Sequence, residues 1–134
     1  DYDRLADPAE QIARINAGTL TVAMIETQMG LDALPEICDV EGLDAIMIGP
    51  DDLSQDLGVP GLMNDPKMVA ATERVIEVCS AKNIPWGFSC QDLAAGEKWL
   101  KRGIRWMPFA NDAAILFNSF SAAAKGLKTL ADRA

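Results

Sequence analysis

Two acidic residues, Glu26 and Asp52, each follow an apolar run that has the composition of a buried strand. The first run ends as VAMIET, and the second is AIMI followed by Gly49-Pro50. Since neighbouring parallel strands lie ~4.8 Å apart and end at the same edge of a sheet, both carboxylates are predicted to face that edge. Two such oxygen ligands can share a divalent cation and leave its other positions to water and further oxygen ligands. A cation held in this way can act as a Lewis acid.

Each acid also has a simpler interpretation. Asp51 and Asp52 stand where a short helix begins, and carboxylates are favoured near the free amides and the positive end of a helix. Asp52 alone therefore fits a capping role, and Glu26 alone fits a solvated loop residue. The turn itself fits substrate binding, because the amides of Asp51 and Asp52 can receive a carboxylate. In that turn Gly49 permits the bend and Pro50 fixes it.

Three further positions are candidates for contact with a ligand or with neighbouring backbone. Gln28 and Ser89 follow predicted strand ends and are candidates for substrate contact, and Gly87 permits close approach of a ligand or backbone. The three cysteines form no C-x-x-C pair, which predicts reduced thiols and neither a disulfide framework nor a zinc site. The sequence contains no histidine, which excludes a Ser-His or Cys-His nucleophile built from this chain alone.

Composition limits the classes of protein to consider. The 134 residues are 49% hydrophobic and 24% charged, which is enough apolar content for one ordinary domain with a buried core. A net charge of -8 without a basic cluster argues against nucleic acid and anionic membranes as partners. No apolar run approaches the ~20 residues of a membrane span, and nothing at Asp1 resembles a signal peptide. We therefore expect a cytoplasmic protein with a small-molecule or protein partner.

Strands and helices alternate along the chain. The predicted strands cover residues 19–26, 45–48, 84–90 and 104–110. The predicted helices cover residues 8–17, 30–40, a short stretch from 51, 66–83 and 92–103, and a last helix capped by residue 111 or 112. Alternation of this kind makes a parallel sheet with helices outside, although Pro108 removes a hydrogen-bond donor from the last strand. A (β/α)8 barrel needs roughly 250 residues, so the chain supplies about half of one.

VAMIET, with Glu26, and LPEICDVEGLDAIMIGPDDLSQDLG, with Asp52, resemble the HpcH/HpaI aldolase and citrate lyase β-subunit superfamily. The resemblance is to the C-terminal half of its metal-dependent class II pyruvate aldolases and covers nearly the whole chain. It implies that residues 1–134 form a single partial domain, strands 5 to 8 of a TIM (β/α)8 barrel with their helices. It also implies that Glu26 and Asp52 bind Mg²⁺, Mn²⁺ or Co²⁺. The substrate-binding residues are then expected to be Gly49, Pro50, Asp51, Asp52 and Ser89.

The activity that the resemblance implies is aldol cleavage or condensation of 4-hydroxy-2-oxo acids, which gives pyruvate and an aldehyde. A CoA-ester lyase of the malyl- or citryl-CoA type is one alternative, and the scarcity of basic residues near the predicted strand ends argues weakly against it. The other alternative is a non-catalytic half-barrel that needs a partner.

The partner-dependent alternative rests on what the chain lacks. In the family an arginine and a histidine come from the first half of the barrel, and this chain has neither position. We expect its open sheet edges to be covered by that half, by a second copy or by exchanged helices. The resemblance also implies a homo-oligomer that exchanges C-terminal helices, with Phe117, Phe120 and Leu127 at the interface.

Overall fold

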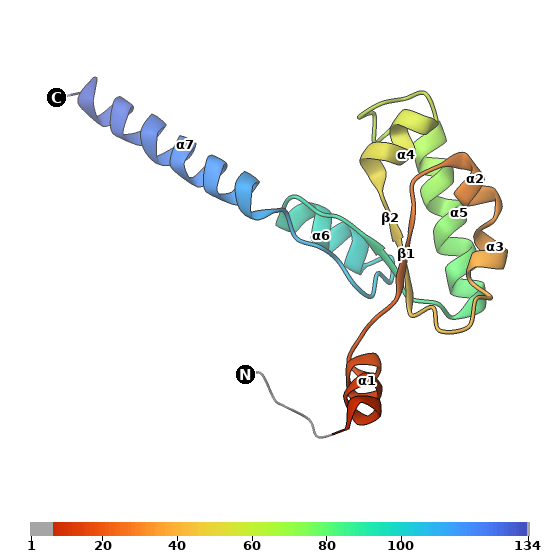
Figure 1. Cartoon of the computed structure of the whole chain (residues 1–134). Coiled ribbons are helices and arrows are strands. Elements are labelled where there is room, and N and C mark those ends of the chain that lie inside the picture. Colours follow the sequence, from red (N-terminus) through yellow and green to blue (C-terminus); the bar gives the residue numbers. More distant parts are fainter. Residues whose placement is uncertain (1–6, 134) are drawn as a thin grey trace. The chain divides into compact units, whose positions relative to one another are not determined.

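The computed structural model describes residues 7–133, so the segment around Asp1, where no signal peptide is expected, lies outside the described residues. The chain forms an α/β structure (Figure 1), and its sheet has the strand order β1-β2-β3. Its strands are β1 (Val22–Ile25), β2 (Ala45–Ile48) and β3 (Trp86–Phe88). Its helices are α1 (Pro8–Ala17), α2 (Gln28–Asp32), α3 (Leu34–Ile37), α4 (Pro50–Asp56), α5 (Pro66–Lys82), α6 (Leu93–Leu100) and α7 (Asp112–Ala131). Two compact units divide the chain after Trp86, and each is described by itself.

Short-range capping determines where the helices of the first unit begin and end. The side chain of Asp7 accepts a hydrogen bond from the Ala9 amide, and that of Asp65 accepts one from Lys67, each at 2.9 Å. A proline follows each of these aspartates at the first helical position, where its missing N–H costs nothing. At the other end of α5, Asn83 adopts the left-handed conformation with φ 55°. The predicted bounds of α1 and α5 are therefore confirmed.

The helix predicted over residues 30–40 is wrong in its extent. The structure has two shorter helices, with Thr27 capping α2 through a 3.0 Å bond from the Gly30 amide, and Ala33 separating α2 from α3. Pro35 lies in the first turn of α3. Because proline has no N–H to donate to the carbonyl four residues earlier, a continuous helix through this point would lose a bond and clash with that carbonyl.

The parallel pair of β1 and β2 forms the centre of the first unit. Ile25 pairs with Ile48, and Val22 pairs with Ala45. All four residues of β2 are buried, as predicted, but in β1 only Ile25 is buried and Met24 is 54% exposed. The prediction that β1 is buried is therefore wrong for one face. Strand β1 lies at the edge of the sheet, and its face with Met24 is opposite to its face with Ile25.

Helix α5 supplies most of the remaining core of the first unit. It contacts α2, α3 and β2, and the three helices lie on the same side of the sheet (Figure 1). Its buried residues are Met68, Ala71, Thr72, Val75, Val78 and Cys79. These positions recur at three- and four-residue intervals, which is the stripe expected of a helix with one face on a sheet.

Cys38 and Cys79 lie side by side in this core. The three cysteines of the chain are free and buried, so the prediction of reduced thiols is confirmed. Burial raises the pKa of Cys38, and a hydrogen bond from Cys79 partly opposes this effect. Burial, reinforced by the charge of Cys38, raises the pKa of Cys79 to about 12.

We expect the free energy of unfolding of the first unit to fall as the pH rises from about 9 towards 12. The unfolded thiol of Cys79 ionises near its ordinary pKa, whereas the folded thiol stays protonated, so stability is fully present below that pKa and is lost above it. The free energy of unfolding should fall by at most about 1.4 kcal/mol per pH unit. Urea unfolding at several pH values, compared between the wild type and Cys79→Ala, measures this slope. Equal slopes in the two proteins would contradict this assignment.

In the second unit the strand predicted over residues 104–110 does not form. Two isolated parallel bridges take its place, one between Gly87 and Trp106 and one between Cys90 and Phe109. Pro108 has no amide to donate, so only its carbonyl takes part, accepting from the Cys90 amide at 3.0 Å. The ladder is therefore interrupted and β3 stays three residues long.

Gly87 is needed for close packing inside the second unit. A Cβ atom at Gly87 would lie 2.7 Å from Cδ1 of Trp106, nearer than real side chains approach. The indole of Trp106 thus covers this glycine. The close approach of a ligand or backbone that was predicted at Gly87 is made by Trp106 of the same unit, which pairs with Gly87 in a bridge and covers it with its indole.

The last helix, α7, begins at the Asn111 cap as predicted, through a 2.7 Å bond from the Ala114 amide. None of its residues is buried, and Phe117 and Phe120 are each 72% exposed. Within the described residues, no helix is both long and apolar enough to cross a membrane. The interface predicted on this helix stays a prediction.

Candidate functional site

Glu26 is the residue directly after β1 and lies against Gly49, the residue directly after β2. The amide of Gly49 donates to the carbonyl of Ile25 at 3.0 Å, which joins the two strand ends. A Cβ atom at Gly49 would lie 2.6 Å from Cγ and 2.8 Å from Oε1 of Glu26. The half-buried Glu26 side chain therefore passes directly over the Gly49 backbone. In the described part of the chain it has no hydrogen bond or ion pair.

Asp52 follows in the first turn of α4, at the same end of the paired strands. Gly49 caps this helix with its backbone, and the first helical bond runs from Leu53 to Gly49 at 3.0 Å. Asp52 is exposed, and its only contact among the described hydrogen bonds is a long one of 3.5 Å from Gln55. The amides of Asp51 and Asp52 precede the first complete helical turn, so they are available to an acceptor. The short helix predicted from the sequence is confirmed, and it begins at Pro50.

Two fully buried residues of α4 hold it in place. The Ser54 hydroxyl donates to the carbonyl of Asp51 at 2.8 Å and accepts from the amide of Gly61 at 2.9 Å. Leu53 and Ser54 are each 0% exposed. The acidic turn is thus connected to the following loop by a satisfied hydroxyl and fixed to the core by a leucine. Ser54 was not among the residues predicted from the sequence, although a serine inside an otherwise amphipathic helix is a weak signal of such a bond.

A second connection runs from α4 back to the segment that follows Glu26. Oδ2 of Asp56 accepts a hydrogen bond from the amide of Gln28 at 2.7 Å. The two residues are 28 positions apart, so no local sequence pattern predicts the bond. Asp56 was therefore missed by the sequence analysis.

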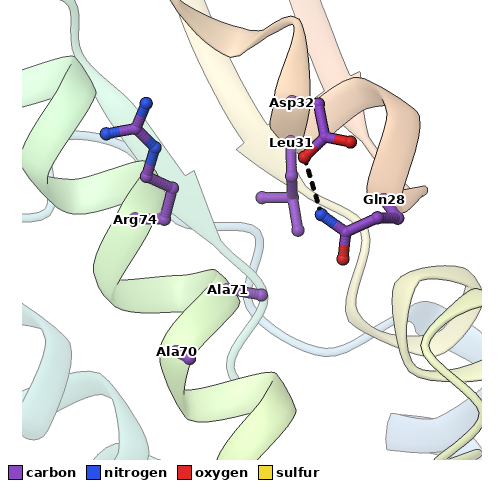
Figure 2. A pocket seen from close by; sticks show the side chains of 6 residues that line it. All are labelled: Gln28, Leu31, Asp32, Ala70, Ala71 and Arg74. Carbon is purple, nitrogen blue, oxygen red and sulfur yellow. Dashed lines mark hydrogen bonds between the residues drawn. The ribbon is translucent and has the colours of Figure 1, made fainter.

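The predicted candidate Gln28 lies beside a pocket between α2 and α5 (Figure 2). The pocket has a volume of about 360 Å³ and is lined by Gln28, Leu31, Asp32, Ala70, Ala71 and Arg74. Nε2 of Gln28 donates to Oδ1 of Asp32 at 2.8 Å, and Arg74 pairs with Glu77 at 3.6 Å. Each of these three polar side chains thus has a protein partner, and the substrate contact of Gln28 stays a prediction.

Ser89 lies in the second unit, half-buried between β3 and the bridge residue Cys90. Glu26, Gly49, Pro50, Asp51 and Asp52 belong to the first unit. The structure thus brings five of the six predicted site residues to the ends of β1 and β2. The substrate contact of Ser89 stays a prediction.

The sequence profile of the HpcH/HpaI aldolase/citrate lyase family matches residues 2–118. The chain belongs to this family. Among curated members it is 29% identical over 124 residues to a 4-hydroxy-2-oxo-heptane-1,7-dioate aldolase of Shigella sonnei, covering 92% of this chain and 46% of the relative. The corresponding enzyme of Salmonella paratyphi B is 29% identical over 133 residues, covering 98% and 46%. The chain thus spans about half the length of the curated relatives it matches.

Solved structures share the fold of this chain. The HpcH/HpaI aldolase from Desulfitobacterium hafniense is 30% identical, with a TM-score of 0.77 over 95% of this chain and 48% of that one. The citrate synthase SbnG is 27% identical, with a TM-score of 0.84 over 98% of this chain and 54% of that one. The predicted fold class is confirmed, since the parallel (β/α) units make up about half of a TIM-barrel-like structure.

The donor groups at the strand ends of this family member fit a divalent cation. Carboxylate oxygens are the ligands that Mg²⁺ and Mn²⁺ prefer, and neither Glu26 nor Asp52 is neutralised by a basic side chain in the described part of the chain. Among residues 7–133 no group of three or more His, Cys, Asp and Glu side chains is arranged to hold a metal. Glu26 and Asp52 therefore supply two carboxylate ligands. The remaining ligands of the cation would be water, substrate or groups from another chain.

Proposed function

We propose that this chain carries the metal-binding part of a divalent-metal-dependent carbon-carbon lyase. The reaction is cleavage or formation of 4-hydroxy-2-oxo acids, with pyruvate and an aldehyde as the products of cleavage. The main support is the Glu26 carboxylate, which is half-buried over Gly49, has no partner among residues 7–133, and lies at the same edge as Asp52. Membership of an aldolase and lyase family supports the same class of reaction.

The residues of this chain have separate tasks in the proposed site. Glu26 and Asp52 hold the cation, which when bound supplies a Lewis acid for the 2-oxo group of the substrate. Gly49 leaves room for the Glu26 side chain, and Pro50 fixes the turn that begins α4. The amides of Asp51 and Asp52 donate to the substrate carboxylate.

We also propose that further residues complete the active site. The described residues supply two acids and a carboxylate-binding turn, and proton transfer requires groups beyond them. These groups are proposed to come from the other half of the barrel or from a second copy in a cytoplasmic homo-oligomer. Ser89 is also proposed to contact the substrate.

A CoA-ester lyase is less well supported by the first unit. Such an enzyme must also bind an anionic nucleotide, for which it needs free basic side chains. On α5, Lys67 donates to the carbonyl of Leu57 at 3.0 Å, Arg74 pairs with Glu77, and Lys82 pairs with Asp39. These three cations are already engaged within the unit.

Deuterium exchange at the methyl group of pyruvate, followed by NMR, tests the proposed function. Where a second copy completes the site, we expect exchange in the presence of Mg²⁺, Mn²⁺ or Co²⁺, its loss on addition of a chelator, and its return when excess metal is supplied. Acetate, which lacks the 2-oxo group, serves as the control and should not exchange. Binding of metal without exchange would indicate that the other half is essential for enolisation. Absence of metal binding would contradict the proposal.

A further inference from the structure

Asp56 connects the two segments that carry the candidate metal ligands. It stands at the end of α4, one turn after Asp52, and its Oδ2 accepts from the amide of Gln28 at 2.7 Å. Gln28 is two residues after Glu26 and is the first residue of α2. The bond therefore runs from the helix of one candidate ligand to the segment of the other.

The charge of Asp56 suits this position. The first amides of α2 have no acceptor within the helix, and Thr27 satisfies only that of Gly30. The Asp56 carboxylate satisfies the amide of Gln28 from outside the helix. A charge-assisted bond of this length is among the stronger hydrogen bonds in proteins, and it fixes the direction in which the chain leaves Glu26.

The segment from Ile25 to Gln28 is thus held at two points. The Gly49 amide bonds to the carbonyl of Ile25 on one side of Glu26, and Asp56 bonds to Gln28 on the other. Both partners come from the stretch between β2 and the end of α4, which also contains Asp52. Groups outside the first coordination shell that hold metal ligands in place strengthen metal binding, and their loss typically costs roughly 10–100-fold in affinity.

We propose that Asp56 is a positioning residue that holds Glu26 at the distance from Asp52 that a shared divalent cation requires. This inference rests on the proposed function of Glu26 and Asp52 as metal ligands. Asp56 itself is not a ligand in this proposal. It acts through the Gln28 amide.

The chain contains a matched control in Asp44. Oδ2 of Asp44 accepts from the amide of Thr21 at 2.7 Å, so this bond has the same length and the same exposed setting as that of Asp56. That bond is just before the strands begin, whereas the Asp56 bond is just after β1 ends. Asp44→Ala should therefore cost a similar amount of stability without moving Glu26.

The experiment measures Mn²⁺ affinity by titration, thermal stability, and amide hydrogen exchange for the wild type, Asp56→Ala, Asp56→Asn and Asp44→Ala. Loss of an outer-shell partner weakens metal binding roughly 10–100-fold, so we expect at least about a tenfold loss in Asp56→Ala. Asp56→Asn keeps an acceptor oxygen for the Gln28 amide and should retain most of the affinity. Asp44→Ala should retain the wild-type affinity, and faster exchange should appear near Thr21 in that variant and near Gln28 in Asp56→Ala.

The possible outcomes separate this inference from the proposed function. Wild-type affinity in Asp56→Ala, or equal losses in Asp56→Ala and Asp44→Ala, would overturn the positioning role while leaving the metal centre intact. A loss in Asp56→Asn as large as that in Asp56→Ala would also overturn it, because charge rather than the bond would then be responsible. If the wild type binds no Mn²⁺, the metal centre and this inference both fail.

Discussion

Replacing Glu26 by glutamine is expected to abolish metal-dependent exchange of pyruvate and to weaken Mn²⁺ binding by more than about 100-fold. Outer-shell substitutions alone cost roughly 10–100-fold in metal affinity, so loss of a charged ligand should cost more. Glutamine has the size of glutamate and can lie over Gly49 in the same way, so the fold should be unaffected. Titration with Mn²⁺ and NMR of pyruvate measure the two effects, and Asp52→Asn should reproduce them.

Glu36→Gln provides the matched control for this substitution. Glu36 is an exposed residue of α3, away from the strand ends, and removing its charge changes the net charge of the chain by the same amount. We expect it to retain the wild-type affinity for Mn²⁺. Equal weakening by Glu26→Gln and Glu36→Gln would show that general electrostatic attraction, rather than ligation, binds the metal.

The second large effect is expected from Gly49→Ala. Its new methyl group would lie 2.6 Å from Cγ of Glu26, so the Glu26 side chain must turn away. We expect Mn²⁺ affinity to fall by about 10–100-fold, as for other losses of ligand orientation. The free energy of unfolding should change by only about 1 kcal/mol, because the clash is with a side chain that can adopt another rotamer. The backbone at Gly49, with φ -90° and ψ 88°, does not itself require glycine.

Two further variants test that explanation. At Gly18 a Cβ atom would meet only ordinary contacts of 3.7 Å, so Gly18→Ala should leave Mn²⁺ affinity unchanged. In a Glu26→Ala background, Gly49→Ala should no longer affect stability, because the clashing atoms are gone. A stability loss that persists in the double variant would place the cause in the Gly49 backbone instead.

Much of the local structure was predictable because its causes lie within a few residues along the chain. The Asp7-Pro8 and Asp65-Pro66 pairs begin helices, and Asn83 ends one, through hydrogen bonds that each helix makes with its own flanking residues. The placement of Glu26 and Asp52 after apolar strands followed from the same kind of pattern. Parallel pairing of β1 with β2 then brought both acids to one edge, as alternation of strands and helices predicts.

The failures have a common cause in contacts between distant segments. The exposure of one face of β1 depends on which face the helices cover. The pairing of the stretch 104–110 with β3 depends on the bond that the carbonyl of Pro108 accepts from the Cys90 amide. Neither can be inferred from periodicity, because a strand pattern does not specify its neighbours. A close approach at Gly87 was predictable from the sequence, but only the packing decided that Trp106 makes it.

The sequence by itself determined the family, the alternation of strands and helices, and the two acids at their strand ends. Only the tertiary structure decided that Glu26 lies over Gly49 and that Asp56 bonds to the amide of Gln28. These contacts join residues 23 or more positions apart, and their geometry arises from the register of two strands rather than from any local preference. Local patterns specify caps and periodicities, whereas the relative positions of ligands depend on how the whole unit packs.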